Sequence, residues 1–131
     1  MIRSMRRMGL GLLLALMPLT NPTVAAGAFD GSYRGAPRET KNNNGGLCRA
    51  MLRDKTPVVI TNSVIKYHWV GQIPIETTVS NDGSFSVDRS GLESRESPGG
   101  SISFKGQIRG GNLEADVGND QCAAHLSYRQ L

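Results

Sequence analysis

The sequence has few of the residues on which most metal and cofactor sites depend. Its 131 residues include only two cysteines and two histidines. Two cysteines without clustered histidines make a poor zinc site. The chain also lacks a phosphate-binding glycine loop, an HExxH motif, an EF-hand loop and a G-x-S-x-G elbow. These absences argue against metal-dependent and cofactor-dependent enzymes, and we expect no cofactor.

A basic and then apolar N-terminus predicts export. Three arginines lie within the first seven residues, and an apolar run of twelve residues follows them. Small residues up to Ala26 and Ala28 suit cleavage by a signal peptidase. The run is shorter than the roughly 20 residues that cross a bilayer, so we favour a cleaved signal over a membrane anchor. We expect residues 1–28 to be a signal peptide cut after Ala26 or Ala28, and residues 29–131 to form one periplasmic or secreted domain.

Basic residues are barely in excess once this signal is set aside. The full chain has 15 basic and 11 acidic residues, and three of the arginines lie in the signal, which has no acidic residue. The remaining chain therefore has 12 basic and 11 acidic residues, with no two basic residues adjacent. Nucleic-acid binding requires a basic surface that displaces counterions. The charge balance argues against nucleic acid and an anionic membrane as partners.

The two cysteines, Cys48 and Cys122, are predicted to form a disulfide. A domain of about 100 residues buries a modest core and, when exported, is often stabilised by a covalent link. Chain-entropy models give roughly 4 kcal/mol for a loop of this length. Two free thiols or two metal ligands are the alternative. Cys48 lies too far from the signal to carry a lipid anchor.

After the signal, apolar and polar residues alternate with a period of two, and no helix-length segment has a period of 3.6. The clearest alternation runs from Ser101 to Val117 on both sides of a Gly110-Gly111-Asn112 turn. This pattern predicts an all-β antiparallel meander. We expect strands at residues 29–34, 47–53, 58–61, 64–80, 84–88, 101–109, 112–117 and 121–129.

The predicted number of strands depends on residues 64–80. Its odd-numbered positions stay apolar straight through Gly71, whereas a one-residue interruption would exchange the two faces. We therefore expect one long strand, bent near Gly71 and Pro74. Eight antiparallel strands can close an up-and-down barrel and place Cys48 and Cys122 at the same end, whereas nine would separate the cysteines. A β-sandwich is the alternative.

Two long connections, Ala36 to Gly46 and Arg89 to Gly100, are expected at the cysteine end. Long loops on a rigid scaffold often carry binding sites. The second connection contains three candidate binding residues, Glu93, Arg95 and Glu96. Paired carboxylates also serve glycoside hydrolysis when they are held rigidly across a cleft. A loop rich in serine and glycine does not hold them in that way, so no catalytic residue is predicted.

Six aromatic residues share the inward parity of their strands: Tyr33, Tyr67, Trp69, Phe85, Phe104 and Tyr128. One interpretation is that they fill the core of a small barrel. The other is that Tyr33, Trp69 and Tyr128 line a pocket for an apolar or sugar-like ligand. His68 and His125 have the opposite parity and are expected to face solvent.

The ends of the predicted domain resemble those of the calycin superfamily, the lipocalin- and avidin-like barrels. Those families open with Gly-x-Trp and carry an arginine on the last strand. Gly31-Ser32-Tyr33 and Arg129 occupy similar places here, with tyrosine replacing tryptophan. The chain is also similar to short exported proteins of Gram-negative bacteria with a Phe-Asp-Gly start, here Phe29-Asp30-Gly31, and repeats such as Gly106-Gln107-Ile108. Both resemblances imply a small β-barrel, and neither implies an activity.

These features favour a non-enzymatic binding module in the periplasm or outside the cell. Its partner is expected to be a small ligand or an extracytoplasmic protein, bound at the loop end of the barrel. One alternative is an inhibitor of an extracytoplasmic hydrolase that presents the connection from Arg89 to Gly100. The other is a small hydrolase.

Overall fold

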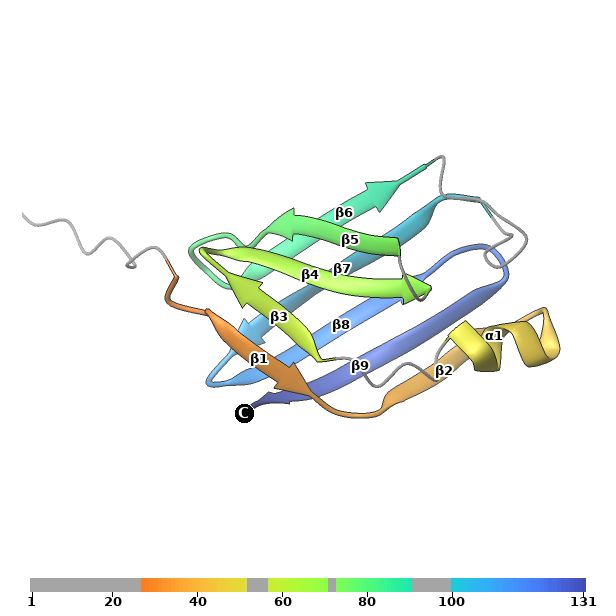
Figure 1. Ribbon diagram of the computed structural model, residues 1–131, viewed down its shortest axis with the longest axis horizontal. Coiled ribbons are helices and arrows are strands. Elements are labelled where there is room, and N and C mark those ends of the chain that lie inside the picture. The colour runs from red at the N-terminus through yellow and green to blue at the C-terminus, as the bar shows by residue number, and fades with distance from the viewer. Residues whose placement is uncertain (1–26, 52–56, 71–72, 91–99) are drawn as a thin grey trace, which may run out of the picture.

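The chain folds into a single antiparallel sheet that curls into a barrel (Figure 1). The computed structural model describes residues 27–51, 57–70, 73–90 and 100–131. Residues 1–26 are outside this range, so the signal peptide stays a prediction. The elements are β1 (Gly31–Arg34), β2 (Pro37–Asn42), α1 (Gly45–Met51), β3 (Val58–Thr61), β4 (Val64–Val70), β5 (Ile73–Thr78), β6 (Ser84–Arg89), β7 (Ile102–Arg109), β8 (Asn112–Gly118) and β9 (Cys122–Gln130).

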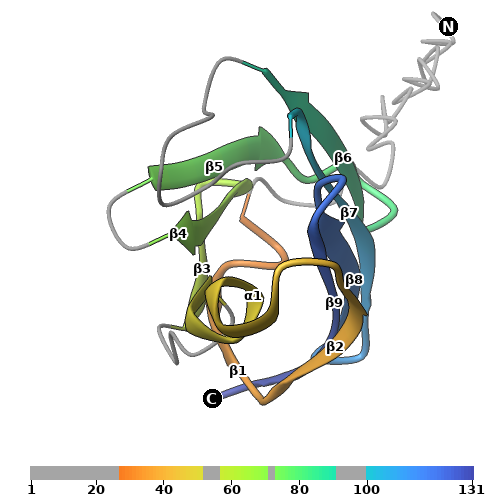
Figure 2. The ribbon, with the colours of Figure 1, turned by 90° about the vertical axis from the view of Figure 1, so that its right-hand side faces the viewer.

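The strands follow the order β5-β4-β3-β1-β9-β8-β7-β6, and β2 also pairs with β9. Along β9, Tyr33 of β1 pairs with Gln130, and Pro37 of β2 pairs with Leu126. β1 and β2 together therefore occupy a single strand position of the ring. This gives eight strand positions, which confirms the predicted eight-strand barrel over a sandwich. Figure 2 shows the barrel from one end, with α1 lying across that mouth.

The ring is nearly closed, with a seam between β5 and β6. No ladder joins these two strands within the described residues. A hydrogen bond from the N–H of Ser80 to the carbonyl of Ser84 (2.8 Å) holds the turn between them. Further along, the Thr77 hydroxyl donates to the carbonyl of Ser86 at 3.4 Å. The seam is thus bridged by a turn and a side chain.

Two tight hairpins form where the sequence predicts them. The β3–β4 turn has Asn62 and Ser63 at φ 50° and 64°, and the β7–β8 turn has Gly110 and Gly111 at 54° and 77°. Positive φ at both central residues matches the twist of the flanking strands. Asparagine and glycine tolerate this conformation best.

The expectation of one long strand over residues 64–80 is wrong, because these residues form the β4–β5 hairpin. Tyr67 pairs with Ile75, and the register of the ladder shifts by one residue at Trp69. Trp69 is the extra residue of a β-bulge. A bulge adds one residue to one strand, which restores the parity that the turn exchanges. Unbroken parity therefore arises here from a bulge and not from a continuous strand.

The expected strand over residues 47–53 is also wrong, because α1 occupies Gly45–Met51. Its sequence contains leucine, arginine, alanine and methionine, which are strong helix formers. Seven residues are too few to display a helical apolar period. The segment therefore carried no signal that separated a short helix from a strand.

The connection from Ala36 to Gly46 is not a loop along its whole length, because β2 fills Pro37–Asn42. β2 supplies main-chain partners to β9 from Leu126 to Cys122. Most of its side chains are exposed, so the segment shows no alternation of apolar and polar residues. Buried main-chain groups without hydrogen-bond partners are costly. The main chain of β9 therefore pairs with β2 although the side chains of β2 are polar.

The predicted disulfide between Cys48 and Cys122 is confirmed. The two Cα atoms lie 5.3 Å apart, and both side chains are fully buried. Cys48 lies in α1 and not at the start of a strand, while Cys122 begins β9. The disulfide therefore fastens α1 across the mouth of the barrel at the point where β9 enters it.

Hydrophobic side chains from every strand position fill the barrel interior. The six aromatic residues of inward parity are all buried there, each at most 6% exposed. The Phe104 ring lies 5.2 Å from that of Tyr67 and 5.0 Å from that of Phe85, between ring centroids. These tilted contacts link β4, β6 and β7 across the interior. Tilted ring pairs of this kind add to the stabilisation from burial.

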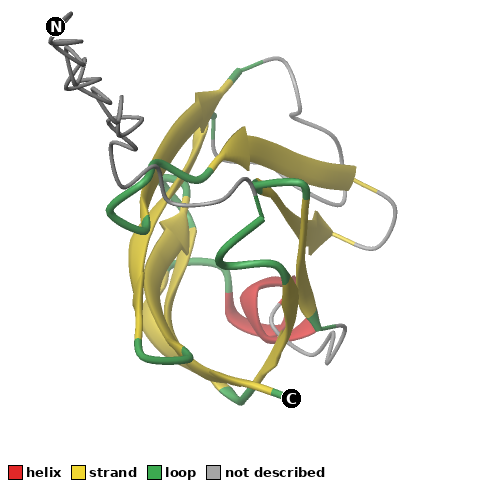
Figure 3. Ribbon diagram, turned by 90° about the vertical axis from the view of Figure 1, so that its left-hand side faces the viewer, coloured by secondary structure: helices red, strands yellow, loops and turns green. Residues whose placement is uncertain are grey.

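Asp30 fastens the N-terminal segment to the barrel mouth opposite α1, the end that faces the viewer in Figure 3. Its carboxylate oxygens accept hydrogen bonds from the N–H groups of Asn62 (2.7 Å) and Ser63 (3.0 Å). The neighbouring carbonyl of Phe29 accepts a 2.8 Å hydrogen bond from the Tyr33 hydroxyl. The Phe-Asp-Gly start thus has a structural role, since it holds the β3–β4 turn.

Replacing Asp30 with alanine is expected to lower the free energy of unfolding by about 1–3 kcal/mol, because two N–H groups lose a charged acceptor. Urea denaturation of the variant and the parent protein measures this. Asp88→Ala is the matched control, because Asp88 is exposed on β6, and it should stay within about 0.5 kcal/mol of the parent. Equal effects of the two substitutions would contradict the structural role.

Candidate functional site

The three aromatic residues proposed for a pocket lie in the packed interior. Tyr33, Trp69 and Tyr128 are 1%, 0% and 3% exposed. Burial, and then the nearby charge of Asp30, raise the pKa of the Tyr33 phenol above its ordinary value. A ligand-binding role for these three residues stays a prediction. The other candidates, Glu93, Arg95 and Glu96, lie outside the described residues.

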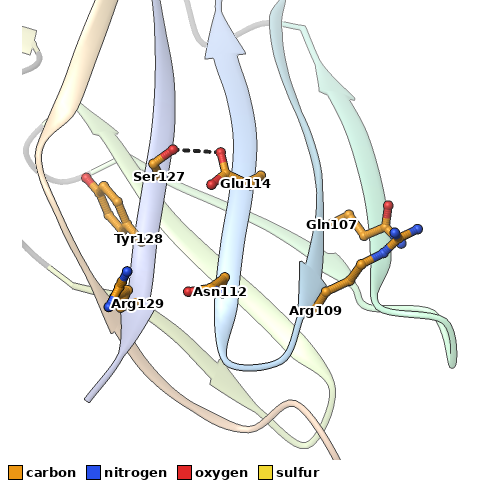
Figure 4. Close-up of a pocket in the computed structure, with 7 residues that line it drawn as sticks. All are labelled: Gln107, Arg109, Asn112, Glu114, Ser127, Tyr128 and Arg129. Atoms are coloured by element: carbon orange, nitrogen blue, oxygen red, sulfur yellow. Dashed lines mark hydrogen bonds between the residues drawn. The ribbon is translucent and has the colours of Figure 1, made fainter.

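A polar surface covers the outer face of β7, β8 and β9. The side chains that alternate with Ile108, Leu113 and Tyr128 point away from the core, because successive residues of a strand face opposite sides. They surround a shallow depression of about 570 Å³ (Figure 4). Its lining residues are Gln107, Arg109, Asn112, Glu114, Ser127, Tyr128 and Arg129.

The register of the ladders arranges this surface in rows across the strands. Gln107 pairs with Glu114, which pairs with Ser127. The Gln107 side chain also lies beside the Arg109 guanidinium (Figure 4). With its amide oxygen turned toward Arg109, Gln107 accepts hydrogen bonds from Nη2 (2.9 Å) and Nε (2.8 Å). The depression therefore offers positioned amide, hydroxyl and guanidinium groups.

Beside the depression, His125 lies between two carboxylates of β8. Its Nδ1 is 2.8 Å from Asp116 Oδ1, and its Nε2 is 2.7 Å from Glu114 Oε2. The Ser127 hydroxyl donates to the same Glu114 oxygen at 2.7 Å. The bond to Asp116, and then that to Glu114, raise the pKa of the His125 imidazole. The Ser127 hydroxyl and then His125 lower the pKa of the Glu114 carboxyl.

This cluster has the residue types of a catalytic triad but a different connectivity. In a triad the serine hydroxyl is bonded to a histidine nitrogen, which removes its proton. Here Ser127 is bonded to Glu114, and both nitrogens of His125 face carboxylates. Carboxylates on both sides of the ring also favour the protonated imidazole, which donates from both nitrogens and has no basic lone pair. The arrangement suits an outward-facing charged network better than activation of a nucleophile.

We expect His125 to titrate above the ordinary histidine pKa of about 6.5 and to stabilise the fold only while it is protonated. A pKa raised on folding gives stability that is present below the unfolded pKa and lost as the pH rises through the folded pKa. The parent protein should therefore lose stability relative to His125→Gln as the pH rises from about 6.5 through the raised pKa of the folded state. Glu114, with its lowered pKa, acts in the opposite direction at acid pH.

An NMR titration of the imidazole resonances tests this directly. Asp116→Asn should lower the pKa of His125, since Asp116 makes the largest contribution to its rise. Two cations face this cluster from neighbouring strands, Lys105 opposite Asp116 and Arg38 opposite His125, and positive charges of this kind act against a rise in the histidine pKa. A His125 that titrates at or below the ordinary value would contradict the network.

Other features of the described residues give no further candidate for chemistry. Within 27–51, 57–70, 73–90 and 100–131, no group of three or more His, Cys, Asp or Glu side chains is arranged to hold a metal ion. No helix in that part of the chain is long and apolar enough to cross a membrane. His125 faces outward as expected. His68 is half-buried, and its Nδ1 has no hydrogen-bond partner among these residues.

Comparison of the chain with protein-family models, curated proteins and solved structures found no match in any of the three. The barrel agrees with the fold that the resemblance to calycins implies. Membership of that superfamily stays a prediction.

Proposed function

We propose that this protein is an exported, non-enzymatic binding module whose ligand lies against the outer face of β7–β9. Export rests on the basic and apolar N-terminus, and a disulfide is compatible with an oxidising compartment. One observation carries the site: hydrophobic side chains fill the barrel interior, while polar groups gather around an outward depression of about 570 Å³. This departs from the sequence-based expectation of binding at the loop end.

The polar groups of the depression support binding better than catalysis. Arg109, Asn112 and Gln107 offer donors and acceptors without a positioned nucleophile and base. Ser127, the hydroxyl on this face, donates to Glu114 and not to a histidine. The site also rests on strands that pair on both sides, and such rigid elements hold recognition groups more firmly than loops.

The proposal is tested by filling the depression with a bulky side chain at an exposed position. Asn112 is exposed at the start of β8, so Asn112→Trp adds a bulky ring without changing the core. Thr78→Trp, at an exposed position of β5, is the matched control. Both proteins and the parent are titrated with a panel of neutral oligosaccharides, acidic oligosaccharides and peptides, and amide chemical shifts are mapped on the barrel.

Shifts should cluster on β7–β9 for at least one class of probe. Asn112→Trp should abolish them, while Thr78→Trp should leave them unchanged. Shifts that centre on α1 or on the β6–β7 connection would instead favour the loop end. If no probe perturbs β7–β9, the proposed function is wrong.

A further inference from the structure

Three arginines fall in one line across four strands of the outer face. Arg34 of β1 pairs with Arg129 of β9, which pairs with Asn112 of β8. Asn112 in turn pairs with Arg109 of β7. All four residues are exposed. We call this line, Arg34–Arg129–Asn112–Arg109, the arginine row.

The arginine row has no acidic member. Within the described residues, none of its three guanidinium groups lies within 4.0 Å of a carboxylate oxygen. The carboxylates on this face, Glu114 and Asp116, are bonded to His125 instead. Hydrogen bonds from Ser84 lower the pKa of Asp82 most, and the charge of Arg109 adds to that lowering. The positive charge of the arginine row is therefore largely unneutralised by neighbouring carboxylates.

This arrangement is unfavourable for the folded protein alone. Like charges directly opposite each other on paired strands destabilise a sheet, and Arg34 and Arg129 occupy such a pair. Arginine also presents a planar fork of donors that fits carboxylate, sulfate or phosphate groups with two hydrogen bonds. A bound anion would relieve the repulsion and accept from Arg34, from Arg129 and from those donors of Arg109 that are not bonded to Gln107.

We propose that the arginine row binds the anionic groups of an acidic polysaccharide. Neighbouring strands lie about 4.8 Å apart, so the row spans roughly 14 Å, with Arg109 roughly 10 Å from Arg129. This spacing exceeds one anionic group and suits a chain that carries several. Between and beside the cations, Asn112 and Ser127 offer an amide and a hydroxyl that can bond to sugar hydroxyls.

A polysaccharide fits this face better than an acidic peptide. Extended peptides commonly bind by adding a strand to a free sheet edge. β8 is paired with β7 and β9 on its two sides, and β9 is paired with β8 and with β1 and β2. The face therefore presents side chains and no free main-chain edge. The inference rests on the proposed function, because it names the ligand class of the same surface.

The test uses defined probes with the full-length protein. Oligogalacturonate supplies carboxylates, a heparin-derived oligosaccharide supplies sulfates, a malto-oligosaccharide of equal length is neutral, and polyglutamate is an acidic peptide. Binding is measured by calorimetry and amide shifts at low and high salt. We expect at least one acidic oligosaccharide to bind and the neutral one to bind at least tenfold more weakly, with affinity falling as salt rises.

Single substitutions then locate the site. Arg109→Gln and Arg129→Gln should each weaken binding about tenfold, as expected for loss of a charge-assisted contact. Arg49→Gln, at an exposed position of α1, removes the same charge at the far mouth and should change affinity less than twofold. Arg129→Gln should also leave the thermal midpoint unchanged or raise it, since it removes a like-charge pair. A purely structural role would lower that midpoint.

The outcomes separate the two proposals. If polyglutamate binds as tightly as the acidic oligosaccharides, or Arg49→Gln weakens binding as much as Arg109→Gln, the inference is wrong. If a neutral oligosaccharide or a peptide perturbs β7–β9 and no acidic oligosaccharide does, the inference fails and the proposed function stands. If no probe perturbs this face, both fail.

Discussion

Reduction of the disulfide between Cys48 and Cys122 is expected to lower the free energy of unfolding by about 4 kcal/mol. The bond joins residues 74 positions apart, and closing so long a loop restricts the unfolded chain strongly. The link also holds α1 against β9 through two fully buried side chains. Since small domains are stable by only about 5–15 kcal/mol, this is a large part of the total.

Urea denaturation with and without reductant measures the effect. Reduced protein is alkylated to prevent reoxidation, and the control is oxidised protein exposed to the same alkylating reagent. Alkylation of buried thiols adds bulk, so Cys48→Ala with Cys122→Ala provides an independent estimate. Thiol labelling of the denatured, unreduced protein should find no free cysteine. A loss below about 1 kcal/mol in the double variant would contradict the role given to the bond.

Replacing Trp69 with alanine is expected to cost about 3–5 kcal/mol, the range for deletion of a fully buried large side chain. Trp69 is 0% exposed and is the extra residue in the β4–β5 bulge. Its removal would leave a cavity next to the register shift. Trp69→Phe keeps most of the volume and should cost roughly half as much or less.

Circular dichroism is the suitable probe, because Trp69 is the only tryptophan of the chain. Val59→Ala is a useful control, since Val59 is 37% exposed on neighbouring β3 and should lose less than about 1 kcal/mol. The experiment also separates the two interpretations of the inward aromatic residues. If Trp69→Ala retains nearly full stability, the ring lines a pocket and does not fill the core.

Sequence patterns predicted those elements whose side chains alternate between core and solvent. β7 and β8 are the clearest case, because Phe104 and Leu113 recur with their neighbours at period two around a glycine turn. β2 shows the limit of the same logic. Its residues Pro37–Asn42 are recruited by main-chain hydrogen bonding to β9, and hydrogen bonding of the backbone leaves no trace in side-chain polarity.

The predicted total of eight strands rests on two differences that offset each other. The bulge at Trp69 preserves parity, so the pattern predicts one strand where the structure has β4 and β5, which is one strand too few. The pattern also predicts a strand around Cys48, where the structure has a helix, which is one strand too many. The ring has no strand position between β1 and β3 for this segment, because those two strands pair directly. Parity alone could not distinguish these arrangements.

The candidate site could not be predicted for a different reason. Arg34, Arg109 and Arg129 are far apart in the sequence, and each one alone is an ordinary exposed residue. Only the registers of three separate ladders bring them into line. The β1–β9 ladder, which sets Arg34 opposite Arg129, joins segments with no turn between them that could indicate the register.

The pairing of β9 with β1 and β2 has a consequence for the order of folding. The last strand to be synthesised is the one that joins the first two strands to β8. Neighbouring hairpins such as β3–β4 and β7–β8 can form as soon as they are made, but ring closure must wait for β9. Contacts between such distant segments slow folding. A nascent chain that lacks β9 would therefore expose unpaired edges on β1 and β8, and during this interval it would be most prone to aggregation.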